Sequence, residues 1–149
     1  MSDRIPSSPP VIKPLSENIE RPLWSVMIPA YNCSKFLRRC LDSVLQQDPG
    51  PSKMQIQVVD DCSTDTNMQS IVEETGKGRV EYFRQERNRG SLRNFETCIN
   101  LAKGKYIHLL HGDDFVDDDF YKEIEGLFSD YPEAGAACTA FWYVDGNEK

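Results

Sequence analysis

The sequence YIHLLHGDDF (residues 106–115) joins a short apolar run directly to a pair of acids. The run YIHLL has the length and apolar character of a buried β-strand. Asp113 and Asp114 repel each other and favour water, so a strand that ends in them ends at something polar. That polar partner is solvent, a metal ion or the hydroxyl groups of a ligand.

The same alternation of strand, polar loop and helix recurs along the chain. Apolar runs that predict strands are LWSVMI (23–28), MQIQVV (54–59), RVEYFR (79–84), YIHLL (106–110) and, late in the chain, AACTAFWYV (136–144). Apolar residues at helical spacing predict helices that begin near Ser34, a candidate N-cap, and near Met68, Leu92 and Phe120. The apolar face predicted for the third helix carries Leu92, Phe95, Cys98, Ile99 and Ala102. We expect Pro29 to end the first strand. This alternation is typical of an α/β fold, a mostly parallel sheet with helices on both faces.

Composition limits the partners. The net charge of −7 argues against nucleic acid or an anionic membrane as the main partner, so any bound phosphate has to be held locally. The five cysteines are odd in number and include no Cys-x-x-Cys pair, so neither a disulfide framework nor a zinc site is predicted. A reducing cytoplasm is the simplest compartment.

Residues 1–22 are predicted to be a flexible, extended leader, because they are rich in proline and poor in apolar side chains. The folded domain is predicted to span residues 23–149. No stretch approaches the roughly 20 apolar residues that span a bilayer. We therefore expect membrane association to be peripheral, at the inner face of the membrane, or to depend on regions outside this chain.

Polar residues follow three of the predicted strands, at residues 31–32, 60–61 and 113–114. Ligands of parallel sheets bind beyond the carboxyl ends of the strands, so we expect a site at this edge. An isolated acidic pair fits a turn or a helix cap equally well. Two pairs on one edge favour Mg²⁺ or Mn²⁺, which share carboxylate contacts with a substrate's phosphates.

Other groups in the sequence are less specific. Arg93, in NRGSLRN, fits a ligand contact and an ordinary helix start equally well, whereas Arg87 and Arg89 favour a solvated loop. A Cys–His catalytic pair is disfavoured, because His108 lies inside a predicted strand and His111 in a turn. His111 could touch a ligand, although a structural turn residue is the favoured interpretation.

Taken in order, SVMIPAYN (25–32), VVDDCSTD (58–65), NRGSLRN (88–94) and GKYIHLLHGDD (104–114) resemble the N-terminal, donor-binding half of glycosyltransferase family 2, which has the GT-A fold. The resemblance covers nearly all of the chain outside the leader. It implies transfer of a sugar from a nucleoside-diphosphate sugar to an acceptor hydroxyl, with inversion and with Mg²⁺ or Mn²⁺ as cofactor. The acceptor it implies is a saccharide or lipid-linked, as in polysaccharide biosynthesis.

The resemblance also implies two sets of site residues. The donor-nucleotide set is Pro29, Ala30, Tyr31, Asn32, Asp60, Asp61, Arg93 and Asp113. The metal set is Asp114 and Asp113. Tyr31 would lie close to the base, Asp61 would hydrogen-bond it and Asp60 would support its loop. Asp113 would meet the ribose or the metal, and Asp114 would bind the cation that bridges the diphosphate.

The sequence departs from the family pattern at two places. Many members have Asp where this chain has His111, so we expect weaker or more selective metal binding. The family takes its general base from a downstream half, so we expect the base to lie beyond Lys149 and the chain to be a truncated piece that binds nucleotide but transfers sugar poorly. The main alternative is a non-catalytic nucleotide-sugar-binding or interaction module with the same fold. A phosphoacceptor signalling domain is disfavoured, because it would need an acidic pair after the first predicted strand, where this chain has PAYN (29–32).

Overall fold

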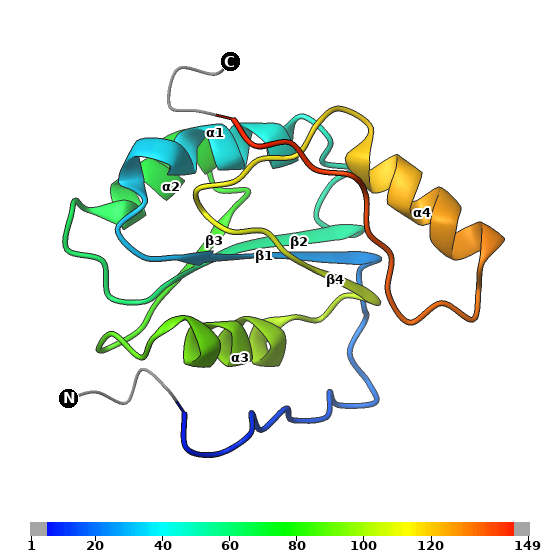
Figure 1. Cartoon of the computed structure of the whole chain (residues 1–149), viewed down its shortest axis with the longest axis horizontal. Coiled ribbons are helices and arrows are strands. Elements are labelled where there is room, and N and C mark those ends of the chain that lie inside the picture. Colours follow the sequence, from blue (N-terminus) through cyan, green and yellow to red (C-terminus); the bar gives the residue numbers. More distant parts are fainter. Residues whose placement is uncertain (1–5, 145–149) are drawn as a thin grey trace. The chain divides into compact units, whose positions relative to one another are not determined.

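The computed structural model describes residues 6–144, and the chain divides into two compact units, one up to Val116 and one from Asp117. The first unit contains strands β1 (Trp24–Ala30), β2 (Met54–Asp60), β3 (Glu81–Arg84) and β4 (Tyr106–Leu109) and helices α1 (Ser34–Leu45), α2 (Met68–Gly76) and α3 (Ser91–Leu101) (Figure 1). The second contains α4 (Phe120–Asp130). No helix among the described residues combines the length and apolar character needed to cross a membrane.

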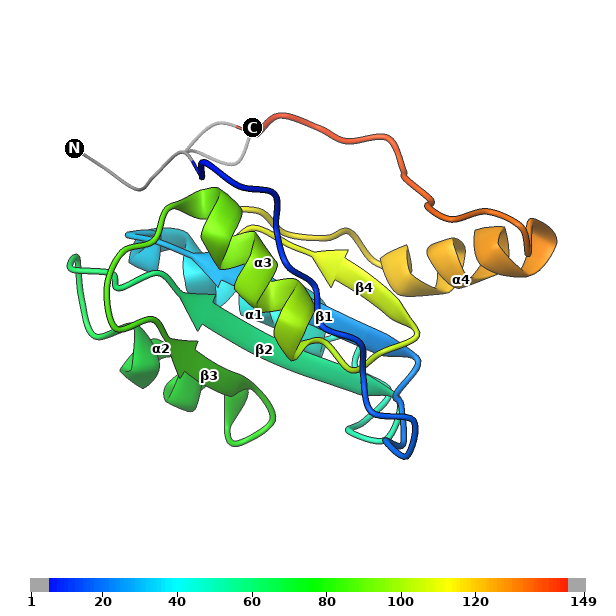
Figure 2. The ribbon, with the colours of Figure 1, turned by 90° about the horizontal axis from the view of Figure 1, so that it is seen from below.

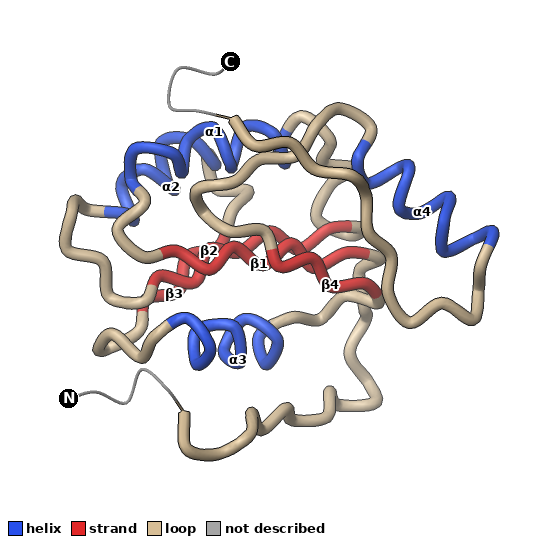
Figure 3. Tube along the Cα trace, in the orientation of Figure 1, coloured by secondary structure: helices blue, strands red, loops and turns tan. Residues whose placement is uncertain are grey.

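The sheet of the first unit is all-parallel, in the order β3-β2-β1-β4. Helices α1 and α2 cover one face and α3 covers the other (Figure 3). Because side chains alternate along a strand, Met27 of β1 and Val59 of β2 lie on the α3 face, where they pack with Cys98 and Ala102. The predicted α/β class is confirmed.

Strand β1 runs through Pro29, so the prediction that Pro29 would end it is wrong. The last pair between β1 and β4 is Met27 with Leu109, and the missing N–H of Pro29 lies beyond that ladder. The carbonyl of Pro29 still accepts a hydrogen bond from the Gly112 N–H at 3.1 Å. Proline therefore costs the sheet little at this position.

Two other local predictions are wrong. Residues 136–144 form no strand, and Phe141, Trp142 and Tyr143 in that segment are exposed. Ser34 is the first residue of α1 rather than its N-cap, which is Cys33. The Ser34 N–H is instead bound by the Asp65 carboxylate at 3.0 Å, so a side chain from another loop satisfies this helix end.

The leader, residues 6–22, forms no helix or strand and runs along the outer side of α3 (Figure 2). The Glu96 carboxylate accepts a hydrogen bond from the Val11 N–H at 2.9 Å. Asn100 donates to the Val11 carbonyl at 3.0 Å and accepts from the Lys13 N–H at 2.9 Å. Side chains of α3 thus bind main-chain groups of the leader, and the predicted flexibility of this segment stays a prediction.

We expect Asn100→Ala to release the leader from α3, because the Lys13 N–H loses its acceptor. A hydrogen bond contributes about 1 kcal/mol, so amide exchange at Lys13 should accelerate by roughly fivefold or more. Gln69→Ala, which removes an amide bonded to Glu73 on the surface of α2, is the matched control and should leave Lys13 unchanged. Equal exchange at Lys13 in all three proteins would show that the leader does not depend on Asn100.

Candidate functional site

The loop His111–Asp114 is held beside the end of β1. The Leu110 N–H donates to the Met27 carbonyl at 3.1 Å, and Gly112 makes the next bond, to Pro29. A Cβ on Gly112 would lie 2.7 Å from the sulfur of Cys33, so a larger residue could not approach β1 as closely without moving that side chain. Backbone bonds and a glycine therefore place this loop at the carboxyl edge of the sheet.

His111, Asp113 and Asp114 form a cluster of possible metal ligands. Each offers one ligand atom, these atoms lie within 4.8 Å of one another, and all three residues are exposed. The loop is turned by a hydrogen bond from the Asp114 N–H to the His111 carbonyl at 3.0 Å. Carboxylate oxygens with one imidazole suit a divalent cation, and the exposure leaves room for water and a ligand's phosphates. The residues present therefore fit Mn²⁺, and they offer Mg²⁺ fewer oxygen ligands than an all-carboxylate set.

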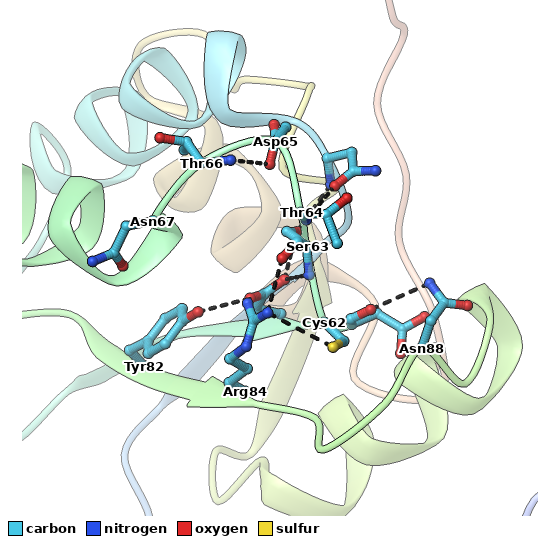
Figure 4. Close-up of polar contacts among 12 residues, drawn as sticks. Cys62, Ser63, Thr64, Asp65, Thr66, Asn67, Tyr82, Arg84 and Asn88 are labelled. Carbon is cyan, nitrogen blue, oxygen red and sulfur yellow. Dashed lines mark hydrogen bonds and ion pairs between the residues drawn. The ribbon is translucent and has the colours of Figure 1, made fainter.

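Asp60, the last residue of β2, has no exposed surface, and its carboxylate accepts four hydrogen bonds. One carboxylate oxygen accepts from the N–H and hydroxyl of Ser63, at 2.9 and 2.5 Å. The other accepts from the Tyr82 hydroxyl at 2.7 Å and pairs with the Arg84 guanidinium. Asp60 thus binds its own loop on one side and β3 on the other, as Figure 4 shows for Tyr82 and Arg84.

Ser63 and Asn32 join the loop after β2 to the loop after β1. The Asn32 N–H donates to the Ser63 hydroxyl at 3.0 Å, and the Asn32 side-chain oxygen accepts from the Thr64 N–H at 2.8 Å. Asn32 has a φ of 50°, in the left-handed region that asparagine tolerates better than most residues. These bonds fix the backbone next to Tyr31, whose side chain is 44% exposed.

Asp61 joins the same edge to α3. Its carboxylate accepts from the Arg89 N–H at 2.7 Å and from the Gly90 N–H at 2.8 Å, and Asn88 donates to its carbonyl at 3.2 Å. Gly90 caps α3 with a φ of 81°, which only glycine adopts readily. A carboxylate at this end of α3 also complements the positive end of the helix dipole.

These loops enclose a cavity of about 320 Å³. Its lining residues are Pro29, Ala30, Tyr31, Cys33, Asp61, Asn88, Gly90, Ser91, Asn94, Phe95, His111 and Asp113. The site residues expected from the sequence that do not line it are Asn32, Asp60, Arg93 and Asp114. Of these four, Asn32 and Asp60 hold the lining loops, and Asp114 lies with His111 and Asp113 in the cluster of possible metal ligands.

Comparison with known families decides which family this fold and site represent. The family model described as Glycosyl transferase family 2 matches residues 25–149. The chain belongs to glycosyl transferase family 2. The expected resemblance is confirmed.

Curated relatives share part of their length with this chain. It is 36% identical over 98 residues to a chondroitin synthase of Escherichia coli, covering 66% of this chain and 14% of that protein. It is 35% identical over 108 residues to an uncharacterised glycosyltransferase of Mycoplasma pneumoniae, covering 71% of this chain and 36% of that protein. The chain therefore spans only about a third or less of these two relatives.

Solved structures confirm the GT-A fold. Residues 1–349 of TarS from Staphylococcus aureus, in complex with UDP-GlcNAc, align with a TM-score of 0.65 at 25% identity over 73% of this chain and 32% of that one. The mannosyltransferase PcManGT of Pyrobaculum calidifontis, in complex with GDP-Man and Mn²⁺, aligns with a TM-score of 0.65 at 22% identity over 84% of this chain and 37% of that one. The second likeness concerns the fold alone.

Arg93, expected from the family 2 resemblance to face the nucleotide, binds the leader. Its guanidinium donates to the Ser8 carbonyl at 3.1 Å and hydroxyl at 2.8 Å, and it pairs with Glu96 at 2.5 Å. Because Ser91 and Asn94 line the cavity, helical geometry directs Arg93 to another side of α3. Its role toward a nucleotide stays a prediction.

Seven lining residues lie outside the two sets expected from the sequence: Cys33, Asn88, Gly90, Ser91, Asn94, Phe95 and His111. Phe95 was assigned to an apolar helix face, but its ring lies 5.3 Å from the ring of His111. Leu92, assigned to the same face, is 55% exposed, so that assignment is wrong. The available signal was the spacing of Ser91, Asn94 and Phe95, which share one side of a helix that begins at the carboxyl edge of the sheet.

Cys33 lines the cavity but is a poor nucleophile. Burial raises the pKa of its thiol to about 11, and the nearby Asp113 carboxylate acts in the same direction. The reactive thiolate is therefore scarce at neutral pH.

Proposed function

We propose that this chain is the donor-binding part of a glycosyltransferase that moves a sugar from a nucleoside-diphosphate sugar to an acceptor hydroxyl with the help of Mn²⁺ or Mg²⁺. The observation that carries the proposal is the charge of the cavity. Among the described residues that line it are the carboxylates of Asp61 and Asp113 but no Lys or Arg. A cation bound beside these carboxylates would offset their repulsion of a diphosphate.

Two loops would share the donor. Tyr31 and Asp61 lie on the part of the cavity formed by the ends of β1 and β2, and we assign them the nucleoside. His111, Asp113 and Asp114 would hold the cation against the diphosphate. When bound, the cation supplies Lewis-acid stabilisation of the leaving diphosphate.

The relatives support this assignment. The chain is similar to a chondroitin synthase and to the poly(ribitol-phosphate) β-N-acetylglucosaminyltransferase TarS. TarS has been solved with UDP and with UDP-GlcNAc, so uridine is the nucleoside to test first. An acceptor that is a saccharide or a lipid-linked polymer, and an inverting displacement, belong to the same proposal.

We place the general base outside the described cavity lining. Asp61 is tied to backbone N–H groups of the Arg89–Gly90 segment, and the thiol of Cys33 keeps its proton. His111 and Asp113 are assigned to the cation. The proposal therefore assigns donor binding to these residues and leaves acceptor deprotonation to another part of the whole protein.

Calorimetric titration with UDP, and then GDP, with Mn²⁺ or with EDTA tests the proposal. We expect UDP to bind in the presence of Mn²⁺ and binding to weaken at least tenfold in EDTA. Asp114→Asn should weaken metal-supported binding by roughly tenfold, because a cation ligand loses its charge.

Asp42→Asn is the matched control for that variant, since Asp42 is an exposed carboxylate on α1 that neither lines the cavity nor belongs to the cluster of possible metal ligands. It should bind UDP as the wild type does. UDP affinity that is the same in Mn²⁺ and in EDTA would contradict the metal-assisted donor site. A folded wild type that binds neither nucleotide would favour the non-catalytic module.

A further inference from the structure

Asp60 ends β2, and two side chains of β3 complete the hydrogen bonds of its carboxylate. Tyr82 and Arg84 both bind the oxygen of Asp60 that Ser63 does not use. A buried carboxylate is unfavourable unless it is paired and hydrogen-bonded. Burial and the hydrogen bond to Asp60 raise the pKa of Tyr82 to about 12, so its hydroxyl keeps the proton that it donates.

Arg84 makes a second set of contacts, with the loop itself. Its other terminal nitrogen donates to the Ser63 carbonyl at 2.8 Å and lies 3.7 Å from the Cys62 sulfur. Cys62 has a φ of 63°, a left-handed conformation that is costly for a residue with a side chain. Figure 4 shows Arg84 reaching from β3 to this strained turn, so one guanidinium holds both Asp60 and the loop that follows it.

The contacts continue from this turn to the cavity. The Ser63 hydroxyl, bonded to Asp60, accepts the N–H of Asn32, which follows the lining residue Tyr31. Neither Tyr82 nor Arg84 lines the cavity. They therefore act on it indirectly, and the hydrogen-bonded route runs through Asp60, Ser63 and Asn32.

We propose that Arg84 and Tyr82 are positioning residues of the donor site, which set its affinity for the nucleoside by fixing the loops after β1 and β2. The inference rests on the proposed function for the identity of the ligand. The coupling from β3 to Asn32 is a property of the protein alone. The loop His111–Asp114 is held to β1 by separate bonds, so the positioning effect should not extend to the cation.

Amide hydrogen exchange tests the coupling without any ligand. We expect Arg84→Gln to accelerate exchange at the N–H groups of Asn32 and Ser63 by about tenfold, since the charged hydrogen bonds from Arg84 to Asp60 and to the Ser63 carbonyl are lost. Arg84→Lys, which keeps the charge, should restore part of the protection. Tyr82→Phe removes one hydroxyl and should act in the same direction with a smaller effect.

Arg38→Gln is the matched control, because Arg38 pairs with Glu74 on the exposed surface of α1 and α2. It should leave Asn32 and Ser63 unchanged. Exchange at Val26 and Ile28 of β1 should stay slow in every variant. Unchanged protection of Asn32 in Arg84→Gln, or equal acceleration along β1, would overturn the positioning role.

Nucleotide and metal affinities then distinguish a positioning role from a general loss of structure. In Arg84→Gln, at a temperature where the protein is folded, we expect UDP affinity to fall by about tenfold while Mn²⁺ affinity, measured by electron paramagnetic resonance without nucleotide, is unchanged. Equal UDP affinity in Arg84→Gln and wild type would overturn the inference. Absence of UDP binding to the wild type would instead overturn the proposed function, and the exchange experiment would still decide the coupling.

Discussion

Gly104→Ala is expected to lower the free energy of unfolding by about 3 kcal/mol or more. A Cβ at this position would lie 2.6 Å from the carbonyl carbon of Trp24, 2.8 Å from the carbonyl oxygen of Tyr106 and closer still to the N of Ser25. All three are backbone atoms, and Trp24 pairs with Tyr106 where β1 meets β4. The added methyl group can fit only if this pairing moves.

The Gly104 N–H also donates to the Ser25 hydroxyl at 2.7 Å, so displacement of this backbone leaves a buried hydroxyl without that donor. Denaturant unfolding followed by circular dichroism measures the loss. Gly126→Ala is the matched control: apart from its own stretch of helix, no atom of residues 6–144 lies within 4 Å of a Cβ at this position, and alanine favours α4 by about 0.5–1 kcal/mol. A Gly104→Ala protein with the wild-type unfolding midpoint would contradict the close approach at this position.

Acidification is the second large effect. Burial lowers the pKa of His108 from 6.5 to about 4. In the unfolded chain the imidazole keeps its ordinary pKa, so between these two values the unfolded state binds a proton that the folded state does not. The contribution of the neutral His108 to the free energy of unfolding is therefore fully present above about pH 6.5. It falls as the pH drops toward 4, by at most roughly 3 kcal/mol.

Urea unfolding of the wild type and of His108→Gln at several pH values between about 7 and 4 measures this contribution. The carboxylates titrate in both proteins, so their effect cancels in the difference between the two free energies of unfolding. We expect the wild type to lose its stability faster than the variant as the pH falls. Parallel stability curves would show that His108 does not titrate between its folded and unfolded states.

Local sequence patterns located the elements well. Apolar runs and helical spacing placed β1, β2, α1 and α2 to within a few residues, because burial on a defined face produces those patterns. These patterns do not indicate which strands pair with one another. Residues 136–144 are apolar enough for a strand, but a strand also needs a neighbour for its backbone groups, and the sequence gives no such information.

The sequence predicted which loops of the sheet form the candidate site, but not the direction in which individual side chains of α3 point. Acids after parallel strands meet at one edge, and the structure brings Asp61 and Asp113 to one cavity. Helical geometry puts Arg93 on another side of α3 than Ser91 and Asn94, and its partner there, Ser8, is 85 residues away, a contact that no local pattern contains. Phe95 is apolar whether it faces a core or a cavity, so only its helical spacing from Ser91 and Asn94 distinguished the two in the sequence.

The central place of β1 has a consequence for how the chain folds as it is made. All seven residues of β1 are buried, yet its neighbour β4 begins with Tyr106, about 80 residues after Trp24. Ribosomes add roughly 5–20 residues per second, so one side of this apolar strand waits for its partner for several seconds or longer. Parallel strands that pair over such separations also associate slowly. We therefore expect β1 to be a binding site for chaperones on the nascent chain, because its apolar residues stay partly uncovered until β4 has been made.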